Sequence, residues 1–150
     1  VRPFNNYGPG LNINDGRVIP DFFKNILENK DIEIYSDGTS TRTFCYISDA
    51  ITGYLLALLS KDKGEIYNIG SALPEISMSD LANLIIEISN SKSKIVYKTN
   101  KDIHYLTNNP QRRCPDISKA KNKLNFSPNI SLEEGLEYTY NYYSDRINEN

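Results

Sequence analysis

Apolar residues recur every three to four positions in five segments of this chain, a period typical of amphipathic helices. The first two segments cover residues 17–29 and 49–59. The third begins at Ser77 and the fifth at Ser131, where "SMSD" and "SLEE" match the capping-box pattern of a helix start. The fourth follows Asp116, which we expect to cap it. The pattern therefore predicts five helices.

Short runs rich in β-branched and aromatic residues lie before and between these segments and are typical of strands. They cover residues 1–4, 32–35, 65–69 and 94–97. The elements follow the order strand, helix, strand, helix, strand, helix, strand, helix, helix. This alternation predicts an α/β fold of small, partly parallel sheets with about five helices packed around them.

The composition of the chain bears on which binding partners are expected. The chain has 150 residues, enough for one domain, with a net charge of -2 and a pI of about 5.4. No basic face for nucleic acid is expected, and no apolar run approaches a membrane span. Cys45 and Cys114 stand far apart, so we expect reduced thiols in a cytoplasmic protein, with a disulfide as the alternative. A single histidine, His104, in a polar loop predicts no metal site.

Arginines mark the candidate chemistry. Arg42 stands in "DGTSTRTF", between a turn and a helix start, and Arg113 ends the pair in "PQRRCP" after a long loop at residues 99–115. A guanidinium held near the core boundary suits phosphate or carboxylate, although a structural salt bridge or a solvated charge pair would give the same local pattern. Tyr97-x-x-x-Lys101 runs from a strand into a loop, so we reject it as a catalytic pair.

Several stretches together carry a family resemblance: "RPFNNYGP", "DGTSTRTFCYISDA", "IYNIGSALPEISMSDLA" and "RRCPDISKAKNKLNFSPNISLEEGLE". In this order they resemble the C-terminal half of extended short-chain dehydrogenase/reductases, the NAD-dependent epimerases and dehydratases of nucleotide sugars. Within that superfamily, "NDGRVIPDF" and "NPQRRCPDISKAK" are most similar to UDP-glucuronate decarboxylases, also called UDP-xylose synthases. Nucleotide-sugar 4,6-dehydratases and 4-epimerases share many of the same stretches and remain alternatives.

The resemblance implies a division of labour. Residues 1–150 would be the nucleotide-sugar substrate-binding domain, inactive alone, and the NAD-binding Rossmann half with the catalytic Tyr-x-x-x-Lys would precede Val1. The whole enzyme would oxidise the sugar at C4 with NAD and then lose CO2 from the 4-keto intermediate. Strand 1–4 would lack its sheet partners, so we expect a homodimer. A non-catalytic nucleotide-sugar binding module, or a pseudo-enzyme kept for oligomeric packing, is the alternative from another class.

The resemblance also implies roles for single residues. Pro3 and Phe4 would lie near the nicotinamide, and Arg113 would also approach the reacting sugar. No catalytic residue is expected in this chain. The substrate, a UDP-sugar by this resemblance, would be bound by six residues: Asn5, Arg17, Tyr35, Arg42, Asn68 and Arg113.

Overall fold

The helices lie where the apolar period predicts them. The computed structural model describes residues 1–98 and 110–148, and within these ranges the cap of the third helix is confirmed: Ser77 Oγ accepts from the Asp80 N–H at 3.0 Å. Ser131 Oγ likewise accepts from the Glu134 N–H, at 3.1 Å. The helices of this part of the chain are α1 (Val18–Leu27), α2 (Ile47–Leu59), α3 (Met78–Ile88), α5 (Ser118–Leu124) and α6 (Leu132–Asn148).

The start of α5 differs by one residue from the expectation. Ile117 occupies the N-cap position and makes no side-chain cap bond. The Asp116 carboxylate nevertheless accepts from the Ser118 N–H at 2.9 Å, so it satisfies one of the free donors at the helix start. The Ser118 side chain, followed by this backbone hydrogen bond, holds the pKa of Asp116 below its usual range.

The strands are short and pair mostly in parallel. β3 (Ile32–Ile34) pairs with β8 (Ile95–Tyr97), and β2 (Asn6–Tyr7) pairs with β5 (Cys45–Tyr46). The expectation of an unpaired first strand is wrong. β1 (Arg2–Pro3) pairs in parallel with β6 (Asn68–Ile69), because the chain returns from α2 alongside its own beginning. An unpaired first strand therefore no longer supports the expectation of a homodimer.

A three-stranded sheet brings together three distant parts of the sequence. β4 (Thr41–Arg42) lies in the middle, antiparallel to β7 (Ile76–Ser77) and parallel to β9 (Arg112–Arg113). The Thr41 N–H donates to the Gln111 carbonyl at 2.8 Å, and the Thr43 N–H donates to the Arg113 carbonyl at 3.3 Å.

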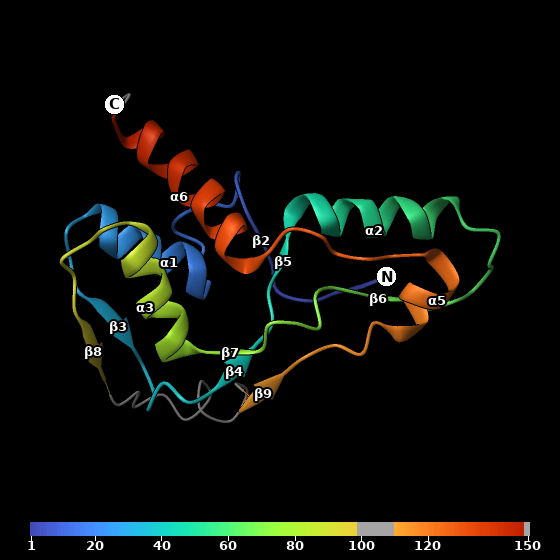
Figure 1. Ribbon diagram of the computed structural model, residues 1–150, viewed down its shortest axis with the longest axis horizontal. Helices are drawn as coiled ribbons and strands as arrows, with labels where there is room; N and C mark the ends of the chain where they lie inside the picture. Colours follow the sequence, from blue (N-terminus) through green and yellow to red (C-terminus); the bar gives the residue numbers. More distant parts are fainter. Residues whose placement is uncertain (99–109, 149–150) are drawn as a thin grey trace.

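Two apolar clusters support the sheets. α1, α3 and α6 gather at one end of the molecule, where Phe23, Ile85 and Leu136 are fully buried. α2 and α5 lie at the other end and pack around Ile69 and Phe126 (Figure 1). The candidate site lies beside the first cluster.

Some predictions fall on residues 99–109, outside the described part of the chain. They concern His104, Lys101 and most of the long loop before "PQRRCP". Within residues 1–98 and 110–148, no helix is both long enough and apolar enough to cross a membrane.

Candidate functional site

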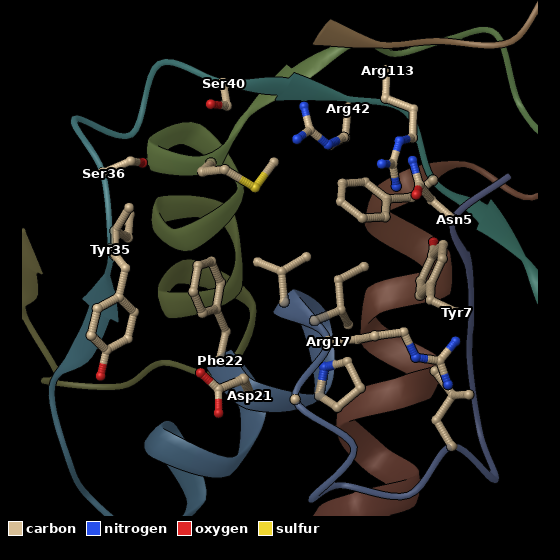
Figure 2. Close-up of a pocket in the computed structure, with 18 of the residues that line it drawn as sticks. Asn5, Tyr7, Arg17, Asp21, Phe22, Tyr35, Ser36, Ser40, Arg42 and Arg113 are labelled. Carbon is tan, nitrogen blue, oxygen red and sulfur yellow. The ribbon is translucent and has the colours of Figure 1, made fainter. Parts of the chain in front are cut away.

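Arg42 and Arg113 are direct neighbours across two parallel strands. The register of β4 and β9 pairs the Cα of Arg42 with that of Arg113, and the Cα of Thr41 with that of Arg112. Paired residues in adjacent strands project from the same face, with backbones about 4.8 Å apart. Two residues 71 positions apart in the sequence therefore present their guanidinium groups side by side (Figure 2).

The alternation of the strands sends neighbouring arginines to opposite faces. Arg112 points away from Arg113 and is engaged by Glu75, through Nε–Oε1 at 2.8 Å and Nη2–Oε2 at 2.7 Å. The Thr41 hydroxyl also donates to Glu75 Oε1, at 2.5 Å. These hydrogen bonds, that of Arg112 first, hold the pKa of Glu75 below its usual range. Arg112 thus forms a structural ion pair, whereas the alternative interpretation for this arginine pair was a solvated charge pair.

Arg42 is a fixed cation. Its side chain is buried, with 6% exposed, and Nη1 donates to the Thr41 carbonyl at 2.7 Å and to the Gln111 carbonyl at 3.3 Å. Arg113 is exposed, and within residues 1–98 and 110–148 its guanidinium has no hydrogen-bond or ion-pair partner. The two arginines together concentrate positive charge at one place. No acidic residue among the described ones pairs with Arg113. An anion with several oxygens suits such a pair.

Both arginines line one cavity of about 740 Å³, a size typical of small-molecule sites. Alternate residues of the β4 segment face it: Ser40, Arg42 and Phe44. The first turn of α1 closes another side, where Phe22 projects into the space between the arginines and Tyr35 (Figure 2). The cavity therefore has polar ends and an apolar middle.

Tyr35 stands at the end of the pocket away from the arginines (Figure 2). Its hydroxyl donates to Glu33 Oε2 at 2.6 Å, and Glu33 is also paired with Lys98. The Lys98 ammonium, and then the Tyr35 hydroxyl, hold the pKa of Glu33 below its usual range, while Glu33 raises the pKa of Tyr35. Tyr35 is 40% exposed, and its aromatic ring could stack on a flat ligand group.

Five of the six predicted substrate-binding residues line this pocket. They are Asn5, Arg17, Tyr35, Arg42 and Arg113. The Asn5 amide donates to the Thr43 carbonyl at 2.8 Å, which fixes that side chain beside β4. Arg17 is held by Asp15, with Nε donating to Oδ2 at 2.6 Å.

The remaining predicted residues lie elsewhere. Asn68 sits on β6 and donates to the Asp116 carbonyl at 2.9 Å, outside the residues that line the pocket. Pro3 and Phe4 also lie outside that lining, on the β1 side of the molecule. Phe4 packs against Gly70, where an added Cβ would stand 2.8 Å from the Phe4 Cβ. Roles for these three residues at the ligand stay predictions.

Several other residues that line the pocket were not predicted from the sequence. Asp21, Glu33 and Ser36 carry polar groups to the pocket, and Met78 and Phe44 contribute apolar surface. Asp21 stands directly before the buried pair Phe22–Phe23 of α1, but an acidic residue in a first helical turn is common and does not by itself indicate a ligand.

The cysteines offer no nucleophile at this site. Both are free thiols, as expected, and Cys45 is buried. Burial, followed by the nearby Asp49 charge, raises the pKa of the Cys45 thiol to about 12, so it stays protonated at neutral pH. Among the described residues no group of three or more His, Cys, Asp or Glu side chains could hold a metal ion.

An NAD site of the Rossmann kind needs a Gly-rich turn between a strand and a helix. The 150 residues contain no G-x-x-G-x-x-G, and β1 and β6 form a parallel sheet of two short strands. The residues of this chain therefore do not fit an NAD site by themselves. The pocket built on Arg42 and Arg113 is instead suited to an anionic ligand with a flat, polar group.

Known proteins share both the sequence and the fold. Residues 1–70 match the family model of the NAD dependent epimerase/dehydratase family. The chain is 38% identical, over 98% of its length, to UDP-glucuronic acid decarboxylase 1 of Arabidopsis thaliana, and covers 32% of that protein. It is also 38% identical, over 99% of its length, to UDP-N-acetyl-alpha-D-glucosaminuronate decarboxylase of Bacillus cytotoxicus, covering 47% of it.

Solved structures of nucleotide-sugar epimerases have the same fold as this chain over nearly its whole length. The UDP-glucuronic acid 4-epimerase of Bacillus cereus, in complex with UDP-glucuronic acid and NAD, matches 97% of this chain with a TM-score of 0.84 and 33% identity. The UDP-glucose 4-epimerase of Thermotoga maritima, with UDP-glucose, matches 97% with a TM-score of 0.88 and 30% identity. This chain covers 44% and 45% of those two chains.

These matches show that the chain is an α/β structure corresponding to part of the extended short-chain dehydrogenase/reductase fold. Residues 1–70 of the chain are similar to the NAD dependent epimerase/dehydratase family, and the decarboxylases named above are similar to nearly the whole chain. The chain spans about a third to just under half the length of the curated relatives described above.

Proposed function

We propose that residues 1–150 form the substrate-binding domain of a UDP-glucuronate decarboxylase. The observation that carries the proposal is the pairing of Arg42 with Arg113, in register on adjacent strands and facing one cavity. A nucleoside diphosphate sugar has the matching shape: a diphosphate for the arginines and a flat base for Tyr35. The similarity to decarboxylases of UDP-glucuronic acid supports this choice of substrate.

The domain has a restricted role in this proposal. When bound by the rest of the enzyme, NAD supplies the oxidation at the sugar that makes loss of CO2 possible. Arg42 holds the diphosphate from a buried, fixed position, and Arg113 reaches both the diphosphate and the sugar. Asn5, which is anchored to the Thr43 carbonyl, orients the same part of the ligand. The chain positions the substrate, and the redox chemistry takes place elsewhere.

A 4-epimerase is the second candidate. It is favoured by the UDP-glucuronic acid 4-epimerase structure, whose identity to this chain is 33%. Because an epimerase and a decarboxylase can bind the same UDP-glucuronate, the pocket does not separate them. Homodimer formation and a cytoplasmic location stay predictions of the sequence.

The activity test uses the complete protein that contains this chain. With UDP-glucuronate and NAD+, we expect release of CO2 and a UDP-pentose product whose mass is lower by one CO2. Product mass and trapped CO2 are the two measurements. An isomer of unchanged mass would replace the decarboxylase by the epimerase, and a lack of UDP-sugar binding would overturn the substrate-binding proposal itself.

A separate prediction concerns the cofactor. The 150-residue chain prepared alone should show no submillimolar NAD+ binding and no turnover, because it lacks the Gly-rich turn that contacts the dinucleotide phosphates. Titration calorimetry with NAD+ measures this, and circular dichroism checks that the helices are formed. Saturable submillimolar binding by the folded chain would contradict the prediction.

A further inference from the structure

The pocket has an acidic end as well as a cationic one. Asp21, in the first turn of α1, lines the cavity together with Glu33 and Tyr35 of the β3 segment. Figure 2 shows Asp21 and Tyr35 on the side of the pocket away from Arg42 and Arg113. A ligand that reaches from the arginines to Tyr35 would therefore meet a carboxylate there.

The two carboxylates at this end differ in their partners. Glu33 is neutralised by Lys98 and also accepts from the Tyr35 hydroxyl. Asp21 is partly buried, and its carboxylate has no hydrogen-bond or ion-pair partner within residues 1–98 and 110–148. Burial is the main cause that raises the pKa of Asp21. The nearby Lys24 charge lowers this pKa in part, and the Glu33 charge raises it further. A partly desolvated carboxylate without a protein donor can accept a hydrogen bond from a ligand or from water, and a ligand that displaces this water must supply a donor to avoid a loss of affinity.

We infer that Asp21 selects the nucleobase by accepting a hydrogen bond from a ring N–H. This inference rests on the proposed function and adds to it the base specificity of the same pocket. Uracil, thymine and guanine carry an N–H on the ring edge that pairs with other bases, whereas cytosine and adenine carry a ring nitrogen lone pair at that place. A carboxylate placed at that ring nitrogen attracts the N–H of the first group of bases and repels the lone pair of the second. The site should thus favour UDP over CDP.

Position supports this assignment. The arginine pair fixes the phosphates at one end, and the exposed ring of Tyr35 offers a stacking surface at the other. Stacking does not distinguish bases, because every base has a flat face. Discrimination needs a polar group beside the stacked ring. Asp21 is such a group, since Glu33 is already engaged by Lys98 and Tyr35.

The test compares Asp21→Ala and Asp21→Asn with the wild type in the complete protein, using UDP, CDP and inorganic pyrophosphate as ligands. The wild type should bind UDP at least about ten-fold more tightly than CDP, as expected for a hydrogen bond to a charged acceptor. In Asp21→Ala the ratio should fall to about three or less, because only the interaction with the base is lost. Asp21→Asn should also lower the ratio, since its amide can donate to the cytosine ring nitrogen.

Controls separate the ends of the pocket. Pyrophosphate affinity should be unchanged in both variants, because it is held by the arginines. Glu28→Gln removes an acidic group at the other end of α1, outside the pocket lining, and should keep the wild-type ratio. Thermal melting checks that each variant is folded.

Each outcome decides the matter. A fall in the UDP-to-CDP ratio in a folded Asp21→Ala variant, with pyrophosphate binding kept, supports the inference. An unchanged ratio in folded Asp21→Ala and Asp21→Asn overturns it while leaving the proposed function intact. Failure of the wild type to bind UDP overturns the proposed function and this inference together.

Discussion

Arg113→Ala should weaken UDP binding by roughly 30- to 4,000-fold in the complete protein, with the melting temperature almost unchanged. Removing one member of a charge pair from a desolvated contact costs about 2–5 kcal/mol. The guanidinium of Arg113 has no partner among the described residues and is exposed, so little stability depends on it. Titration calorimetry with UDP and thermal melting measure the two effects.

Arg42→Ala should lower UDP affinity over the same range but also lower stability. Arg42 is buried and donates to the carbonyl groups of Thr41 and Gln111. Its loss removes the hydrogen bonds from a charged donor to both carbonyl groups, at about 1–3 kcal/mol, although the Gln111 carbonyl keeps the Thr41 N–H as a donor. Arg42→Lys retains a positive charge and some donors but not the planar fork, so it should fold better than Arg42→Ala and still bind UDP more weakly than the wild type.

Arg112→Ala provides a matched control for charge. Arg112 lies next to Arg113 on β9 but faces Glu75 instead of the pocket. As an exposed ion pair it should contribute about 0–1 kcal/mol to stability, and its removal should change UDP affinity by less than about three-fold. If Arg112→Ala weakens binding as much as Arg113→Ala, long-range charge is the cause. If either folded Arg42→Ala or Arg113→Ala binds UDP like the wild type, that arginine does not grip the diphosphate.

The helices could be predicted because their signals are local. An apolar stripe with a period of 3.6 residues and a serine cap are contained within a dozen positions, and burial of that stripe is what stabilises the helix. Ser77 and Ser131 therefore marked the starts of α3 and α6 correctly. The predicted cap of α5, Asp116, lies one residue before the observed N-cap position. Its carboxylate nevertheless accepts a hydrogen bond from the first turn of the same helix.

The sheet that builds the site could not be predicted in this way. β4 and β9 have two residues each, too few for an alternating pattern to be visible. The pairing of Arg42 with Arg113 spans 71 positions, and only the fold decides which face each residue occupies. The local sequence did not decide between an anion site and a structural salt bridge for Arg42, or between an anion site and a solvated charge pair for Arg113. The family resemblance placed them in one pocket, and the strand register supplies the physical reason.

The acidic end of the pocket escaped prediction for a related reason. Asp21 has the local character of an ordinary first-turn acid, which favours a helix N-terminus and needs no ligand. Its position across the pocket from two arginines depends on how α1 packs against β3 and on which β4 residues line the same pocket. Asn68 shows the converse, since the resemblance placed it near the ligand and the structure places it outside the pocket lining.

Asp49→Ala should lower the free energy of unfolding by about 2–4 kcal/mol. Asp49 is buried in the first turn of α2, and its Oδ2 accepts from the N–H groups of Asn129 and Ile130 at 3.0 and 2.9 Å. The segment that it holds runs from Phe126 in one apolar cluster to Leu132 in the other. Truncation leaves two backbone donors without this acceptor, and hydrogen bonds to a charged group contribute about 1.5–3 kcal/mol each, with partial compensation by water.

Glu133→Ala separates this clamp from a general effect of helix charge. Glu133 is also an acidic residue in a first turn, that of α6, but it is exposed and makes no such backbone contact in the described structure. Its loss should cost only about 0.3–1 kcal/mol. Asp49→Asn keeps an oxygen acceptor and should fall between the two variants. Denaturant titrations of all three measure the order. A cost for Asp49→Ala no larger than that for Glu133→Ala would show that the two clusters hold together without this clamp, because the dipole interaction common to both residues would then account for the whole effect.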